Sequence, residues 1–139
     1  MKILFYKIFP IFVFYTELFV PMGGTSYTFG PFCFILIKPK YRNDEGLLNH
    51  ELTHIKQHWK SYWGHSYKYN NSDKYRYESE LEAYAVQYLS YPDKQHFDLF
   101  IEFMLEKYKF TYGKRAIEGE LKAKLKKLGH IVQRYGPTS

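Results

Sequence analysis

The hydrophobic pattern of the chain changes character near residue 40. The N-terminal part is rich in aromatic and β-branched residues and is interrupted by glycine and proline, which predicts strands, the clearest of them at residues 31–38. We expect residues 1–22 to form buried strands or a short helix of the core rather than a membrane attachment. Lys7, Pro10 and Glu17 break this run before it reaches the roughly 18–20 apolar residues that a membrane span needs.

Beyond residue 44 the apolar positions recur with the period of a helix. The first predicted helix has a narrow apolar stripe at i, i+4, i+7 and i+11, formed by Leu48, Leu52, Ile55 and Trp59. Asn43 or Asp44, in the polar segment before it, is suited to cap this helix. His50 and His54 lie roughly 160–240° around the helix from the stripe, so we do not expect them on the face that the stripe buries.

Three further helices follow in the sequence. They are predicted at residues 74–91, where Pro92 ends the helix, at 93–110, and at 114–128 with Gly129 after the last turn. A connection with a turn signal at residues 70–73 precedes them. Because the strands come first and the helices are consecutive, we predict an α+β fold with a short N-terminal sheet. At 139 residues, 1–139 is expected to be a single domain.

Charge and cysteine content narrow the class of protein. The net charge is +6, and Lys114–Arg134 contains seven Lys/Arg against two Glu, so the excess belongs to a basic C-terminal helix and tail at residues 114–139. We interpret the basic side of this helix as solvated, and nucleic acid is a disfavoured partner. Docking to an anionic membrane surface is an alternative, through this helix or through the apolar N-terminal segment. The single cysteine, Cys33, is expected to be buried and inert, which favours a cytoplasmic location.

The stretch "HELTH" carries the strongest chemical signal. Two histidines four residues apart stand above one another on a helix, so His50 and His54 can both bind one Zn²⁺. Glu51 lies beside them and is placed to accept a proton rather than to ligate. His58 is too far along a straight helix to join the same ion, and we expect it to border the site or face solvent. His65 is a possible ligand, but no spacing from the other two histidines supports it.

A third metal ligand is expected from "YESELEAYAVQY", which opens the second helix with Glu78, Glu80 and Glu82. Glu80 shares a face with Ala83 and Gln87, and the small alanine allows another helix to approach closely. Glu80 is therefore the geometric choice among the three glutamates. The alternative, that they are solvated residues complementing the helix dipole, suits Glu78 and Glu82 better.

Together these motifs resemble the gluzincin metallopeptidases, and most closely small bacterial and phage proteins reading "HE-x-x-H-x-x-Q … E-x-E-A-Y". The matching residues of this chain, within a motif-bearing core at residues 31–90, are His50, Glu51, His54, Gln57, Glu80, Glu82, Ala83 and Tyr84. The resemblance implies a minimal zincin-like fold with one zinc ion bound by His50, His54 and Glu80. It also implies that Glu51 is the general base for peptide-bond hydrolysis.

The same resemblance leaves the supporting residues open. Relatives often carry Asp or Asn where this chain has Tyr84, so Tyr84 and Gln57 are candidates for supporting a zinc ligand. Tyr75, Tyr77 and His65 are candidates for stabilising the oxyanion of the reaction. The substrate would be a peptide or protein, and we expect the strand "PFCFILIKP" to form the edge of the cleft and pair with it. The alternative is a non-catalytic zinc-binding interaction module.

Overall fold

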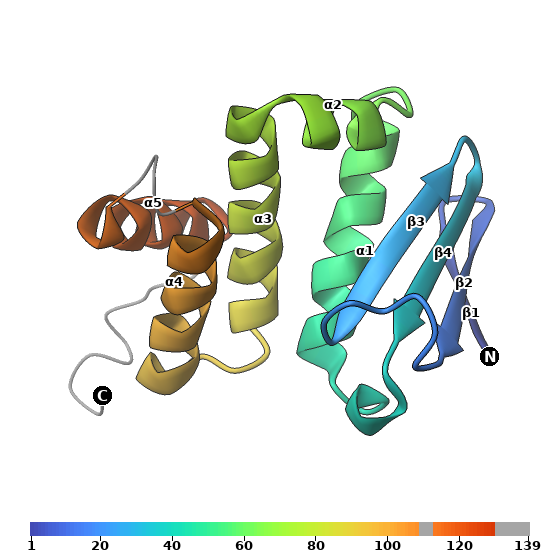
Figure 1. Ribbon diagram of the computed structural model, residues 1–139, viewed down its shortest axis with the longest axis horizontal. Helices are drawn as coiled ribbons and strands as arrows, with labels where there is room; N and C mark the ends of the chain where they lie inside the picture. Colours follow the sequence, from blue (N-terminus) through green and yellow to red (C-terminus); the bar gives the residue numbers. More distant parts are fainter. Residues whose placement is uncertain (109–112, 130–139) are drawn as a thin grey trace.

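Strands and helices occupy separate parts of the computed structural model, which describes residues 1–108 and 113–129 (Figure 1). A four-stranded mixed sheet is formed by the N-terminal part of the chain, and five α-helices follow within the described residues. The predicted α+β class is confirmed. Of the basic segment, residues 130–139 lie outside the described part of the chain.

The sheet has the strand order β1-β2-β4-β3. Its strands are β1 (Lys2–Tyr6), β2 (Phe9–Tyr15), β3 (Gly24–Phe29) and β4 (Phe32–Ile37). β4 pairs in parallel with β2 and antiparallel with β3, so it is an interior strand. The expectation that this segment forms the edge is therefore wrong, and the edge strand on that side is β3. The physical reason is visible in the sequences, because "FCFILI" is apolar on both faces whereas "GTSYTF" is partly polar.

The helices largely follow the predicted positions. They are α1 (Glu45–Lys60), α2 (His65–Asn71), α3 (Asp73–Tyr88), α4 (Lys94–Tyr108) and α5 (Lys114–Lys127), with a short 3₁₀ turn at Pro39–Tyr41. The prediction missed α2, which lies in the segment interpreted as a connection. The turn signal does mark a boundary, since Ser72 accepts a hydrogen bond from the Tyr75 amide and caps α3. Gly129 follows α5 with a φ of 80°, as expected of a residue after the last turn.

Helix α1 lies between the sheet and the other helices (Figure 1). On one side its Ile55 joins a cluster with buried sheet residues, among them Val13 and Ile35. On the other side it packs against α3, which shares a second apolar cluster with α4 and α5. The expectation of buried N-terminal strands holds for β2 but not for β1, because Phe5 of β1 is 67% exposed.

Two further expectations concern the burial of Cys33 and the absence of a membrane span. Cys33 is buried in β4, and burial raises the pKa of its thiol, an effect that a hydrogen bond with Trp59 only partly offsets. The thiol is therefore protonated and shielded, as expected of an inert cysteine. None of the helices in the described part of the chain is both long enough and apolar enough to cross a bilayer.

Candidate metal centre

Helix α1 presents the two histidines on the side that faces away from the sheet. The helix is started by Asp44, whose carboxylate accepts a hydrogen bond of 2.9 Å from the Leu47 amide. Further along α1 the rings of His50 and His54 meet edge to face, with centroids 5.0 Å apart. Both are 6% exposed, so their imidazoles are removed from bulk water.

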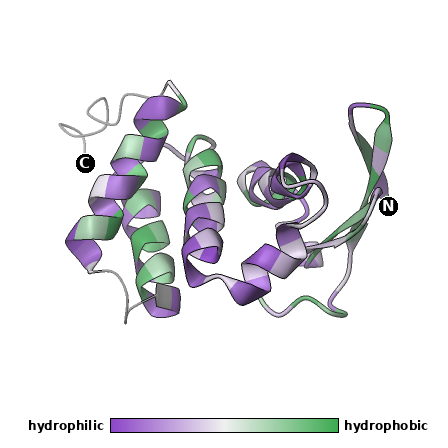
Figure 2. Cartoon of the chain, turned by 90° about the horizontal axis from the view of Figure 1, so that it is seen from above, coloured by the Kyte–Doolittle hydropathy of each residue, from purple (hydrophilic) through white to green (hydrophobic). Residues whose placement is uncertain are grey.

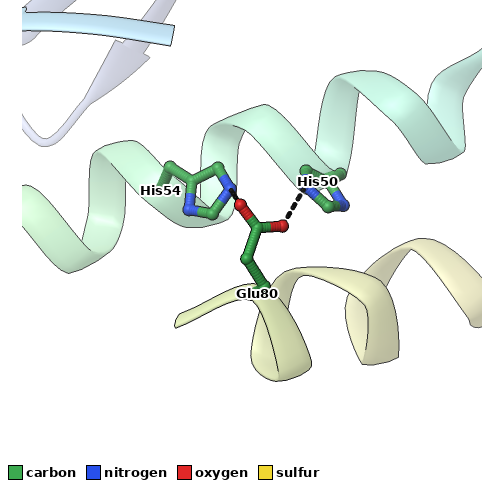
Figure 3. Close-up of side chains that lie close together, drawn as sticks. All are labelled: His50, His54 and Glu80. Atoms are coloured by element: carbon green, nitrogen blue, oxygen red, sulfur yellow. Dashed lines mark ion pairs between the residues drawn. The ribbon is translucent and has the colours of Figure 1, made fainter. Parts of the chain in front are cut away.

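Glu80 reaches the two histidines from α3 (Figure 3). Its Oε2 lies 3.4 Å from Nε2 of His50, and its Oε1 lies 3.5 Å from Nε2 of His54. The carboxylate is buried, and the ligand atoms of all three residues lie within 4.8 Å of one another. α3 can approach closely here because Ala83, one turn after Glu80, is fully buried and small.

These separations fit a shared metal ion. Four ligands arranged tetrahedrally at about 2.0–2.1 Å from zinc lie about 3.3–3.5 Å from each other. The two measured distances fall in this range but exceed the usual 2.7–3.2 Å of a hydrogen bond. Accordingly Oε2 of Glu80 is buried without a hydrogen-bond partner among the described residues. The three side chains thus converge without satisfying one another, and such a group could hold one metal ion.

Gln57 fixes the protonation of one of these histidines. Its amide nitrogen donates hydrogen bonds of 3.0 Å to the Ser79 carbonyl and to Oε1 of Glu82. The amide oxygen is thereby directed to Nδ1 of His54, at 2.9 Å. Since that oxygen can only accept, Nδ1 must carry the proton, and Nε2, which faces Glu80, is left as the nitrogen that can bind a metal. This is the tautomer that a metal ligand requires.

His50 has a different environment. Its ring packs edgewise against Tyr84, with centroids 4.6 Å apart. Its Nδ1 is buried without a hydrogen-bond partner among the described residues. Tyr84 therefore restricts the imidazole by packing.

Glu80 is held ionised by its surroundings. Burial alone would raise its pKa, but the neighbouring imidazoles of His50 and His54 and the ammonium of Lys107 outweigh burial and lower the pKa well below its usual range. Lys107 Nζ, from α4, lies 3.7 Å from Oε2. The hydroxyl of Tyr69, from α2, donates to Oε1 at 2.5 Å. An ionised carboxylate is the form that binds a cation.

Glu51 occupies a different side of α1 from the three converging residues. It is buried and lies against the edge strand, where a Cβ added to Gly24 would come within 3.5 Å of Cγ and Oε1 of Glu51. It is not part of the group that could hold the ion. Glu51 nevertheless lines the same cavity as His50 and His54.

That cavity is about 930 Å³ in volume and is bounded by the edge strand β3 on one side and by α2, α3 and α4 on the others. Its size is that of a site for a sizeable ligand. β3 contributes residues 24–28 to the wall, and Lys107 and Tyr69 also line it. Among the described strands β3 pairs only with β4, so its other edge has backbone groups that are free of strand pairing beside this cavity.

Two other residues that the sequence suggested for the site, His65 and Tyr77, lie in different surroundings. His65 lines the cavity, and its Nδ1 is 2.8 Å from the Tyr75 hydroxyl. Burial, reinforced by the charges of His54 and His58, lowers the His65 pKa to about 4, so its imidazole is neutral at pH 7. Tyr77 is 1% exposed and belongs to the apolar cluster of α3, α4 and α5.

His58 differs from the expectation that it borders the site or faces solvent. It is 1% exposed, and its Nε2–H donates to the Gly30 carbonyl at 2.7 Å, tying the end of α1 to the β3–β4 turn. Gly30 has a φ of 59°, a conformation that favours glycine at this turn. His58 is thus a structural residue of the α1–sheet interface.

Sequence reasoning missed Tyr69 and Lys107. Tyr69 follows His65 by four residues, a helical spacing that could have been noticed had α2 been predicted. Nothing in the sequence marks Lys107, which reaches the site only because α4 packs along α3.

No protein-family model, curated protein or solved structure matches this chain. The metal centre therefore rests on its own geometry: a buried His-His-Glu group that could hold one ion of a kind the structure does not specify.

Proposed function

We propose that the protein is a zinc-dependent peptidase with Glu51 as its general base. The observation that carries this proposal is the position of Glu51, which is buried in the same cavity as the three ligands but is not one of them. A purely structural metal site has no use for a second carboxylate at this place. A catalytic site needs a base next to the ion and space for a substrate.

The donor set suits zinc, since two histidines and one glutamate form a known type of catalytic zinc site with an open position. When bound, zinc would polarise the scissile carbonyl and lower the pKa of a water toward about 7. Glu51 would accept the proton of the attacking water and deliver it to the leaving nitrogen. Gln57 would keep His54 in the ligating tautomer throughout.

The substrate that fits the cavity is a peptide in an extended conformation. Within the described residues β3 pairs with β4 alone, and β3 contributes to the wall of the cavity that contains Glu51. An extended peptide can add to this edge by backbone hydrogen bonds. It would then pass in front of the ligands. We expect a bound peptide to slow amide hydrogen exchange at residues 24–29, and no protection there would count against this binding mode.

The general-base role is tested by Glu51→Gln, assayed with a library of fluorogenic peptides. We expect hydrolysis to fall by about 10²–10⁴-fold while the metal content stays unchanged, because the amide cannot accept the proton. Glu45→Gln is the matched control, since Glu45 is exposed in the first turn of the same helix. Equal hydrolysis by Glu51→Gln and wild type would contradict the proposal. A metal-loaded wild-type protein that cleaves nothing would favour the non-catalytic binding module.

A further inference from the structure

Helix α4 presents a mixed surface to the cavity of the metal centre. Apolar residues fill the middle of α4, which Figure 2 colours largely hydrophobic, and polar residues stand at its two ends. Leu99, Phe103 and Lys107 follow one another at four-residue spacing, so they lie on one side of the helix. All three line the cavity. This side of α4 therefore offers an apolar wall and, one turn further on, an ammonium group.

The apolar wall adjoins one of the proposed metal ligands. The ring of Tyr84 contacts the His50 imidazole at a centroid distance of 4.6 Å. The same ring packs against Phe100 at 5.2 Å and against Phe103 at 6.1 Å. Leu99, which also lines the cavity, is 43% exposed. An apolar side chain of a ligand bound next to His50 would cover this wall and be stabilised by burial.

Lys107 stands beside Glu80 with its donors available. Its Nζ lies 3.7 Å from Oε2 of Glu80, which is longer than the 2.7–3.2 Å of a hydrogen bond, and its side chain is 34% exposed. Glu80 is the only ion-pair partner of Lys107 among the described residues. A metal ion bound by Glu80 would neutralise this carboxylate and repel the ammonium. The loaded site therefore favours a second anion at Lys107, and a ligand in the cavity can supply it.

The other charges of the cavity favour an anionic ligand as well. Its described lining contains three lysines and three carboxylates, namely Lys38, Lys40, Lys107, Asp44, Glu51 and Glu80. These formal charges cancel, so a bound divalent ion would leave the cavity positive. A positive cavity raises the local concentration of anionic ligands. In a peptide of apolar residues, the anion is the C-terminal carboxylate.

The short distance from Lys107 to Glu80 selects the position of that carboxylate along the peptide. Nζ lies 3.7 Å from a ligand atom, and one residue of an extended chain spans at most about 3.6 Å. A peptide bond held at the ligands thus brings the carboxylate of the very next residue to Lys107. We propose that Lys107 binds the free C-terminus of a peptide whose last, apolar side chain lies on the α4 wall, so that the enzyme removes one C-terminal residue.

This inference rests on the proposed peptidase function and names its substrate. Water adds a hydroxyl group to the carbonyl carbon of the last peptide bond, and the leaving nitrogen takes a proton. The products are a shortened peptide and a free amino acid. Lys107 binds and positions the substrate and takes no part in the proton transfer. An internal peptide bond has no carboxylate at this position and would leave Lys107 unpaired, which makes it a poorer substrate.

The first measurement is independent of hydrolysis. Zinc-loaded Glu51→Gln protein is titrated by calorimetry with an acetylated tripeptide that ends in phenylalanine, either as the free carboxylate or as the amide. We expect the carboxylate to bind about 10–100-fold more tightly, the range for a hydrogen bond to a charged group. Adding Lys107→Met should remove this difference, and Lys107→Arg should retain it. Lys114→Met is the matched control, since Lys114 Nζ also lies 3.7 Å from a carboxylate oxygen, that of Glu102, outside the cavity lining.

Hydrolysis gives the second measurement. Wild type should release phenylalanine from the carboxylate peptide with a kcat/KM at least about 10-fold above that for cleavage of the amide. Lys107→Met should raise KM for the carboxylate peptide more than it lowers kcat. Alanine in place of the terminal phenylalanine should lower kcat/KM by at least about 10-fold. Leu99→Ser should reduce this preference, whereas Leu128→Ser, at the end of α5 and similarly exposed, should not.

Zinc affinity separates recognition of the peptide from support of the metal. Lys107→Met should bind zinc at least as tightly as wild type, because removing a nearby cation cannot weaken the attraction of another cation. Weaker zinc binding would assign Lys107 to the metal centre and overturn the inference. It is also overturned by equal binding of the carboxylate and the amide, by a carboxylate preference that survives in Lys107→Met, or by cleavage of internal bonds only. Binding of the carboxylate through Lys107 without any hydrolysis would support the recognition and contradict the peptidase function instead.

Discussion

Gln57 orients His54 through a hydrogen bond of 2.9 Å between its amide oxygen and Nδ1 of the imidazole. The two residues lie one turn apart on α1, and the Gln57 amide nitrogen is anchored on α3 by the Ser79 carbonyl and the Glu82 carboxylate. Lys124 of α5 in turn lies 3.5 Å from Glu82 Oε2. A ligand of the proposed metal is therefore connected to three helices.

Replacing Gln57 by leucine should weaken zinc binding by about 10–100-fold, the usual effect of losing a residue that orients a metal-binding histidine. Titration against a chromophoric chelator measures this affinity. Gln95→Leu is the control, since Gln95 is exposed on α4 away from the site. Unchanged affinity in Gln57→Leu would show that the hydrogen bond does not support the metal.

Gly46, in the first turn of α1, should not tolerate a side chain. A Cβ there would lie 2.4 Å from the Tyr91 ring, which is held in place by stacking on His96 and by its hydroxyl bond to Asp44. We expect Gly46→Ala to lower the free energy of unfolding by about 1–3 kcal/mol, because overpacking outweighs the gain in helix propensity.

The matched control for this prediction is Gly119→Ala in α5, where nothing lies within 4 Å of an added Cβ. This variant should be more stable by about 0.5–1 kcal/mol. Urea denaturation measures both changes. If Gly46→Ala and Gly119→Ala shift stability in the same direction, the close contact with Tyr91 does not constrain α1.

The free energy of unfolding should fall at alkaline pH because of the ionisation of Tyr88. Burial, together with the charge of Asp93, raises the pKa of Tyr88 to about 12, whereas an unfolded tyrosine titrates near 10. The contribution of Tyr88 to the free energy of unfolding is complete below pH 10. It is lost as the pH rises through about 12, because the unfolded state releases the tyrosine proton first.

Urea denaturation at pH 8 and pH 11 measures this effect. Tyr88→Phe should lose less stability between the two pH values than wild type, whereas Tyr67→Phe, which alters an exposed tyrosine, should behave as wild type does. An identical loss in Tyr88→Phe and wild type would show that Tyr88 titrates normally.

Much of the site was predictable because its signals are local. The spacing of His50 and His54 depends only on helix geometry, and Glu80 could be selected from three glutamates by the face it shares with Ala83. The structure brings these three ligand candidates together. Gln57 belonged to the same motif, although its bond to His54 required the structure to be seen.

The features that escaped prediction depend on contacts between distant segments. Lys107 and Tyr69 reach Glu80 only through the packing of α4 and α2. His58 is an exposed residue on a free helix but is buried once the β3–β4 turn meets α1. The interior position of β4 had a signal in the sequence, its continuous apolar run, but that run was interpreted as the edge of the cleft rather than as a strand paired on both sides.

His50, His54 and Glu80 are proposed to hold one metal ion, and the metal content of the purified protein tests this most directly. Three single variants, Glu78→Ala, Glu80→Ala and Glu82→Ala, are compared with wild type by elemental analysis after dialysis. Glu78 is exposed near Lys74, and Glu82 contacts Gln57 rather than the ligand atoms. We predict one zinc ion per chain in wild type and in Glu78→Ala, at most a weaker affinity in Glu82→Ala, and none in Glu80→Ala. Zinc retained by Glu80→Ala as in wild type, or absent from wild type after exposure to zinc, would contradict the account.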